Sequence, residues 1–268
     1  MHVFTKSVTA YAHVFVVTAA FVPSSTVDVA LAAAATLVAL AFALATLDRW
    51  GRRRKPQDAA WTVALFLFAV ATFALWYGLA HGWDDGSFRV FYLAGAVLNV
   101  PWLGLGEVYL LWGRRAGDLT RTVLIGLSGF AVGVVLVAPI KGTIPINEIP
   151  EGSEHFGAGP RILAAVGSGV PALLLIGGAI WTVWGFLRAR SRGDRSIPVV
   201  RVWGIVLIAV GTIALSLSGT LAARLGKDRA FIVTTLAGVT ILFAGFLMSS
   251  APIRPGRSTR EPSAELAA

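Results

Sequence analysis

One acidic residue, Glu107, lies within a long apolar stretch, and it is the residue best placed for chemistry inside a membrane. The other Asp and Glu residues fall at the ends of apolar stretches or in the segments between them. A carboxylate in hydrocarbon costs about 2.5–3.5 kcal/mol on insertion scales, so such a group usually has a partner or a function. Glu107 is therefore the first candidate for proton or cation handling.

The residues before Glu107 are unusual for a membrane helix. Steps of four, three and four residues predict that four of them share one helix face: Gly95, Asn99, Trp102 and Gly106. Pro101 has no N–H, so the carbonyl of Val97 loses its usual donor. A freed carbonyl beside an amide side chain suits a ligand or water. We expect a polar track of Val97, Asn99, Pro101, Trp102 and Glu107.

Structural roles for the same residues stay open. From its depth Glu107 could extend to the membrane interface, pair with Arg114 seven residues on, or accept a hydrogen bond from a neighbouring helix. Asn99 and Pro101 could serve helix packing alone. Small residues also predict close helix contacts at Gly129 with Gly133 and at Gly211. Gly-Ser-Gly at 167–169 before a proline predicts a kink or a broken helix.

A second group of ionisable residues falls in two segments predicted on the outer membrane face. The group has five carboxylates and two imidazoles: His81, Asp84, Asp85, Glu148, Glu151, Glu154 and His155. Acids concentrate cations, and oxygen and imidazole ligands suit divalent metals. The spacing matches no closed metal motif. A cation-attracting vestibule, a metal site and an ordinary solvated loop are the three interpretations.

Composition defines the elements that must position these residues. Hydrophobic residues make up 56% of the chain and charged residues 14%, against about 25% charged in soluble domains. The apolar residues come in blocks of about 20, the length that crosses a bilayer core. We predict an all-α bundle of seven transmembrane spans: 29–48, 60–81, 89–112, 120–139, 161–187, 199–223 and 230–250.

Charge sets the predicted orientation. The net charge of +9 is concentrated in alternate short loops, which favours a membrane orientation signal over nucleic-acid binding. Basic loops stay in the cytoplasm, so the amino end lies outside and the carboxyl end inside. The segment 224–229 is the one basic loop that falls outside. High Arg, Ala, Val and Gly content suggests a bacterial plasma membrane.

Three regions follow from this organisation. Residues 1–28 form an amino-terminal segment that is interfacial, signal-like or a short extra span, and 29–250 form the bundle. Residues 251–268 form a polar cytoplasmic tail predicted to be disordered. The loop 139–161 contains four prolines, which prevent a long helix, and it is long enough to cap the bundle.

Two comparisons with known families follow from these residues. The proline and carboxylate at 101 and 107 loosely resemble microbial rhodopsins, but the last span has Gly238 where those proteins carry a retinal-binding lysine. The stretch 89–112, with Leu98-Asn99-Val100-Pro101, and the segment 154–161 resemble multi-pass actinobacterial membrane proteins with no established activity. This resemblance supports the topology and transfers no site residue.

The sequence therefore predicts an integral membrane protein, with permeation of a small solute, cation or proton past Glu107 as the leading hypothesis. The alternative is a non-catalytic sensor or assembly partner that uses the loop 139–161 to bind a ligand, a second copy or a membrane partner. We expect no enzyme, because no nucleophile–base pair is visible. We expect no cofactor, since the chain has no cysteine and no histidine pair at helical spacing.

Overall fold

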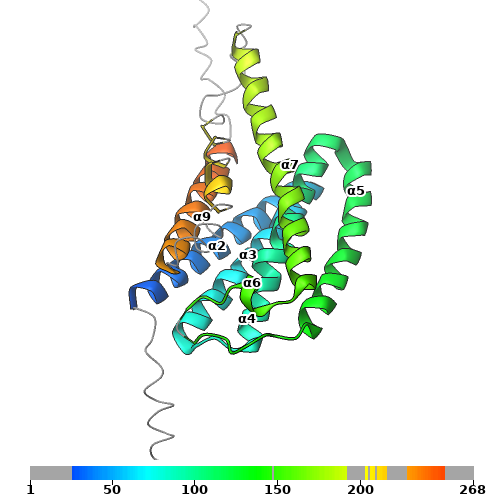
Figure 1. The fold of residues 1–268 in the computed structure, drawn as a ribbon. Coiled ribbons are helices and arrows are strands. Elements are labelled where there is room, and N and C mark those ends of the chain that lie inside the picture. Colours follow the sequence, from blue (N-terminus) through cyan, green and yellow to red (C-terminus); the bar gives the residue numbers. More distant parts are fainter. Residues whose placement is uncertain are drawn as a thin grey trace, which may run out of the picture.

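The computed structural model describes residues 26–146, 148–191, 203–204, 206–208, 210–215 and 228–250, and all regular structure within them is helical (Figure 1). The elements are α2 (Thr26–Arg53), α3 (Pro56–His81), α4 (Asp85–Phe91), the π-helix η1 (Tyr92–Leu98), α5 (Asn99–Val137), α6 (Gly152–His155), α7 (Ala158–Ser191) and α9 (Asp228–Ser250).

Five helices are long and apolar enough to cross a membrane, which identifies a membrane-embedded helical protein. Four of them cover all or most of the predicted first, second, fifth and seventh spans. The fifth runs from Asp85 to Val137 and covers the predicted third span and residues 120–137 of the fourth. Most of the predicted sixth span lies outside the described residues, as do nearly all of the amino-terminal segment and the whole carboxyl tail.

The helix from Asp85 to Val137 is a hairpin bent at Gly113. Gly113 has φ +79° and ψ −172°, a conformation that a side chain would strain. The bend separates a first arm, residues 85–112, from a second arm, residues 114–137. Three contacts connect the arms from the bend to the far end: Tyr109 Oη with Asp118 Oδ1, Trp102 Nε1 with Ser128 Oγ, and Arg89 Nη2 with the Ala138 carbonyl. The arms are therefore antiparallel.

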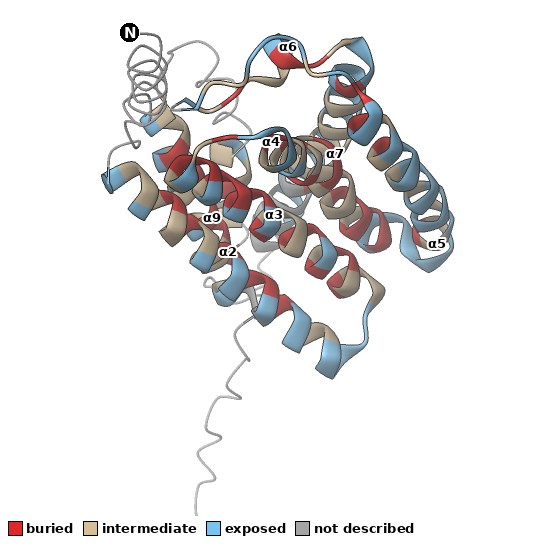
Figure 2. Cartoon of the chain, turned by 90° about the horizontal axis from the view of Figure 1, so that it is seen from below, coloured by how far each residue is buried: buried red, intermediate tan, exposed pale blue. Residues whose placement is uncertain are grey.

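The first arm occupies the centre of the helix arrangement. It packs between α3 and α7, while α2 packs against α3 and α9. Figure 2 shows buried residues along the facing sides of α2 and α3, and mostly exposed residues along the second arm of α5. The second arm exposes seven large apolar side chains: Leu119, Val123, Ile125, Leu127, Phe130, Leu136 and Val137. Such a surface suits contact with lipid tails.

The two ends of the bundle differ in chemistry. One end, which we name the loop end, carries segment 138–157 and the first residues of α2, α4, α7 and α9. The other, which we name the arginine end, carries the turn between α2 and α3 and the bend at Gly113. Five basic residues precede or form the turn: Arg49, Arg52, Arg53, Arg54 and Lys55.

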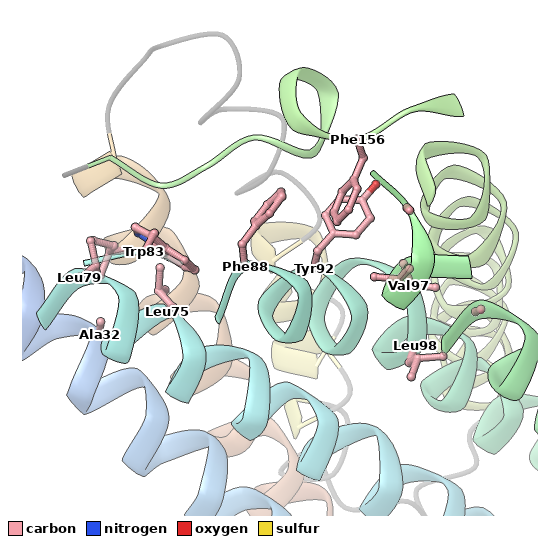
Figure 3. Close-up of a cluster of buried hydrophobic side chains, with 13 residues drawn as sticks. Ala32, Leu75, Leu79, Trp83, Phe88, Tyr92, Val97, Leu98 and Phe156 are labelled. Carbon is pink, nitrogen blue, oxygen red and sulfur yellow. The ribbon is translucent and has the colours of Figure 1, made fainter. Parts of the chain in front are cut away.

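Segment 138–157 folds over the loop end, as the sequence predicts. The only helix among its described residues is the four-residue α6. Figure 3 shows Phe156 reaching from this segment towards Phe88 and Tyr92. Phe156 stacks on Phe88 with ring centroids 4.9 Å apart, and its ring lies 4.8 Å from that of Tyr92. Because Phe88 and Phe156 are almost fully buried, this contact anchors the segment to the bundle.

Candidate functional site

The first arm of α5 and α7 meet along a seam of small residues and prolines. A methyl group added at Gly104 would lie 2.8 Å from Cβ of Pro171, and one added at Gly167 would lie 3.0 Å from the Val97 carbonyl oxygen. Only glycine permits this approach. The helix α7 continues through Pro171, so the predicted break is absent. The ring of Pro171 is accommodated against Gly104 instead.

Two backbone carbonyls that each lose their usual hydrogen-bond donor to a proline lie close together in this seam. Pro101 cannot donate to the Val97 carbonyl, and Pro171 cannot donate to the carbonyl of Gly167. The Val97 oxygen itself lies against Gly167, so both carbonyls belong to one level of the bundle. Carbonyl oxygens with spare acceptor capacity are the groups that replace water around a dehydrated cation. The two carbonyls therefore form a candidate binding site for a cation within the seam.

Glu107 lies on the same seam, closer to the arginine end. A methyl group added at Gly178 of α7 would lie 3.3 Å from Glu107 Oε2. Glu107 is half-buried, and it forms no ion pair within the described residues. The predicted pairing with Arg114 is wrong, because Arg114 Nε lies 3.7 Å from Asp118 Oδ2. The bend at Gly113 turns Arg114 away from the first arm.

The four residues predicted to share one face diverge in the structure. Gly95 lies against Ala71 of α3, and a methyl group on Gly106 would overlap the ring of Trp61. Trp102 instead donates from Nε1 to Ser128 Oγ at 3.3 Å, across the hairpin. The π-helix η1 contains Gly95 and ends before the other three residues, so it changes only the register of Gly95 relative to them.

A cavity of about 890 Å³ adjoins the seam. The described residues that line it belong to α3, the first arm, α7, α9 and segment 145–154, together with Thr212 and Leu215. Asn99 lies in this wall, as do the hydroxyl residues Thr72, Ser168 and Thr235. The cavity therefore combines a mostly apolar surface with a few neutral polar groups deep within the bundle, which is typical of small-molecule sites.

Four acids form the mouth of the cavity at the loop end. Glu148, Glu151 and Glu154 line it, in agreement with the predicted vestibule. Asp228, the first residue of α9, lines it too, and its Oδ2 accepts a hydrogen bond of 3.1 Å from the Ile149 N–H. Sequence reasoning missed Asp228, although its segment was placed on the same side of the membrane as the other three.

The remaining members of the predicted vestibule do not line the cavity. His155 is buried, and its Nδ1 lies 3.0 Å from the carbonyl oxygen of Lys141. His81 stacks on Tyr77 with ring centroids 4.7 Å apart. Asp85 is exposed in the first turn of α4. Within the described residues, no three His, Asp or Glu side chains are grouped to hold a metal ion.

Asp84 caps helix α4. Its carboxylate Oδ1 accepts from the Ser87 N–H, and the Ser87 hydroxyl accepts from the Asp84 N–H at 3.0 Å. Together these bonds form a reciprocal capping box. The hydrogen bond from the Ser87 backbone holds the pKa of Asp84 below its ordinary value of 3.8.

Because the folded pKa of Asp84 is lowered, the cap stabilises α4 above about pH 4 and is lost as the pH falls through the folded value. We expect amide exchange in residues 85–91, corrected for intrinsic rates, to accelerate between about pH 5 and pH 3. Asp84→Asn retains a capping oxygen without titrating, so it should remove this acceleration. Equal acceleration in both proteins would contradict the assignment.

The cavity ends one helical turn before Glu107. Along the first arm its lining extends to Leu103, and along α7 to Leu175. Glu107 and Gly178, which are in contact, occupy the next turn of each helix. The two leucines thus separate an acidic, water-facing mouth from a half-buried carboxylate.

A buried ion pair lies at the arginine end, and the sequence reasoning did not anticipate it. Arg49 Nε donates to Asp58 Oδ1 at 2.9 Å, and Asp58 is only 2% exposed. The guanidinium lies over the ring of Phe246 at 4.4 Å and near that of Trp61 at 5.4 Å. Asp58 Oδ2 has no hydrogen-bond partner in the described part of the chain. This pair connects α2, α3 and α9.

Comparisons with family models, with curated proteins and with solved structures each return no match. The assignment of function therefore rests on the cavity, the seam and Glu107. The class that these features define is a helical membrane-embedded protein with a large internal cavity.

Proposed function

We propose that this protein conducts a small solute or a cation across the membrane through the cavity and past Glu107. The observation that carries the proposal is a cavity of about 890 Å³ that joins an acidic mouth to within one helical turn of a half-buried carboxylate. An ionisable residue within a membrane span is by default a candidate for an ion or substrate path. Acids at a cavity mouth raise the local concentration of cations.

The path has four successive environments. A cation enters between Glu148, Glu151, Glu154 and Asp228, where carboxylates replace part of its hydration shell. It then passes the Asn99 amide at the level of the Val97 and Gly167 carbonyls. Movement of Leu103 and Leu175 admits it to Glu107, whose carboxylate accepts the cation or a proton. Such alternating exposure of a site near the membrane midplane is how secondary transporters move a solute.

The proposed topology places the loop end outside the cell and the arginine end in the cytoplasm of a bacterium. Basic residues follow α2 and the bend at Gly113, and they favour the cytoplasmic face of a plasma membrane. The predicted sixth span, 199–223, brings the number of spans to seven and so places the amino end outside and the carboxyl tail inside. Close packing of four described residues against α9 supports it: Gly204, Ile208, Gly211 and Leu215.

We expect purified protein in proteoliposomes to give cation or proton flux above that of empty liposomes, measured by rubidium uptake and an internal pH dye. Glu107→Gln should reduce that flux about tenfold or more. A unit charge at 4 Å is worth about 4 kcal/mol at an effective dielectric constant of 20, and about 1.4 kcal/mol suffices for a tenfold change in rate. Asp48→Asn, an exposed acid of α2 that is remote from the cavity, is the matched control.

The absence of flux in correctly folded wild-type protein would refute permeation of these ions. Flux that is equal in the wild type and in Glu107→Gln would keep permeation and remove Glu107 from the path.

A second function, ligand sensing, is favoured by one observation: segment 145–154 forms part of the cavity wall, so an occupant of the cavity would contact an exposed surface segment directly. Ligand binding without flux would support that function.

A further inference from the structure

The size and wall of the cavity indicate more than a path for an inorganic ion. Ion filters are narrow rings of carbonyl or carboxylate oxygens. This cavity measures about 890 Å³, within the range of about 300–1,000 Å³ that is typical of pockets for organic ligands. We propose that it binds an organic cation with an aromatic body, held between the acidic mouth and the aromatic side chains of the cavity wall. The inference names a solute class and rests on the proposed function.

The sign of the ligand charge follows from the wall. Four carboxylates line the cavity, from Glu148, Glu151, Glu154 and Asp228, and its described lining contains no Lys or Arg. Glu151 accepts a hydrogen bond from Ser153 Oγ at 3.0 Å, and Asp228 accepts one from the Ile149 N–H. These bonds hold two of the carboxylates in place at the mouth. A cation gains attraction from all four groups, and an anion is repelled.

Aromatic rings give the cavity a preference for a flat, delocalised cation. Phe68, Phe91, Tyr92 and Phe231 all contribute to the wall, from α3, the first arm and α9. Phe91 and Phe231 meet edge to face with ring centroids 6.2 Å apart. Ring faces attract organic cations, with energies that rise when water is excluded. A hydrated inorganic ion does not use such a surface.

The test is equilibrium binding of ethidium to the full-length protein in detergent, followed by its fluorescence. Ethidium is a permanent aromatic cation, so it matches the charge of the mouth and the aromatic side chains of the wall. We expect saturable binding that tetraphenylphosphonium displaces. The anion anilinonaphthalene sulfonate should show no saturable binding that tetraphenylphosphonium displaces, because the mouth repels it.

One variant tests the acidic mouth. The triple variant Glu148→Gln, Glu151→Gln, Glu154→Gln should raise the ethidium Kd about tenfold or more, since three charges at the mouth are lost. Asp48→Asn is the matched control, because Asp48 is an exposed acid of α2 that does not line the cavity, and its Kd should equal that of the wild type.

The absence of saturable ethidium binding to folded wild-type protein would overturn the inference, as would an unchanged Kd in the triple variant. The assay needs no flux, so its outcome is separate from that of the proposed function. Ion flux without ethidium binding would refute only the solute class, and ethidium binding without rubidium or proton flux would refute only the permeation of those two ions.

Discussion

Replacement of Asp58 by alanine is expected to lower the free energy of unfolding by about 3–5 kcal/mol, because it removes the carboxylate from a buried ion pair and leaves the guanidinium of Arg49 in place. Asp58 is 2% exposed and the side chain of Arg49 is 15% exposed, so water replaces little of the lost interaction. Denaturant unfolding in mixed micelles, followed by tryptophan fluorescence, measures the change.

Asp48→Ala provides the control for Asp58→Ala. Asp48 pairs with Arg52 on the surface of the same helix, with side chains 56% and 73% exposed, and exposed pairs contribute about 0–1 kcal/mol. Replacing both buried partners, Arg49→Met with Asp58→Leu, should recover much of the stability, because no buried charge is then left. If Asp58→Ala and Asp48→Ala lowered the free energy of unfolding equally, the buried Arg49–Asp58 pair would contribute no more stability than an exposed pair.

Hydropathy predicted where the helices lie, but it could not reveal this ion pair. Apolar blocks of about 20 residues predicted the positions of the described helices well, because a bilayer fixes the length of each element. Asp58, by contrast, precedes the predicted start of the second span and therefore looked like a loop acid. The helix begins at Pro56, two residues before Asp58, and the turn at Arg54 and Lys55 brings Asp58 against Arg49.

The acidic mouth was predicted only in part, for a related reason. Topology places Asp84, His155 and Glu151 at one end of the bundle, but it does not say which of them faces the cavity. Asp84 and His155 are used locally, as a helix cap and as a buried hydrogen-bonding ring. For Asp84 a signal existed, since an acid three residues before Ser87 at a helix start is typical of a capping pair. His155 gave no such signal.

Glycine patterns show the same limit of sequence reasoning. The pair Gly129 and Gly133 has the spacing of a helix-contact motif, yet a methyl group added at either position would meet nothing within 4 Å. Gly211 belongs to no such pair, and it lies directly against the backbone of α9. The spacing of two glycines identifies a helix face without large side chains, but only the tertiary arrangement determines whether a neighbouring helix packs on that face.

Gly211→Ala is accordingly expected to destabilise the protein by about 1–3 kcal/mol, the usual cost of overpacking. The added methyl group would lie 2.7 Å from the Leu242 nitrogen and 2.9 Å from the Gly238 carbonyl oxygen. Both are backbone atoms, so no side-chain rotation relieves the overlap and the helices must separate. Unfolding in mixed micelles measures the loss, and a lower melting temperature in detergent provides a second readout.

Gly133→Ala tests whether the backbone contact, rather than the loss of a glycine, causes that effect. At an open helical position alanine is favoured over glycine by roughly 0.5–1 kcal/mol, so this variant should be as stable as the wild type or slightly more stable. If Gly211→Ala were tolerated equally well, segment 203–215 would not pack against α9 as described, and the support it gives to a span over 199–223 would be lost. If Gly133→Ala were the destabilised variant, its open face would have to contact a second copy of the chain or another membrane partner.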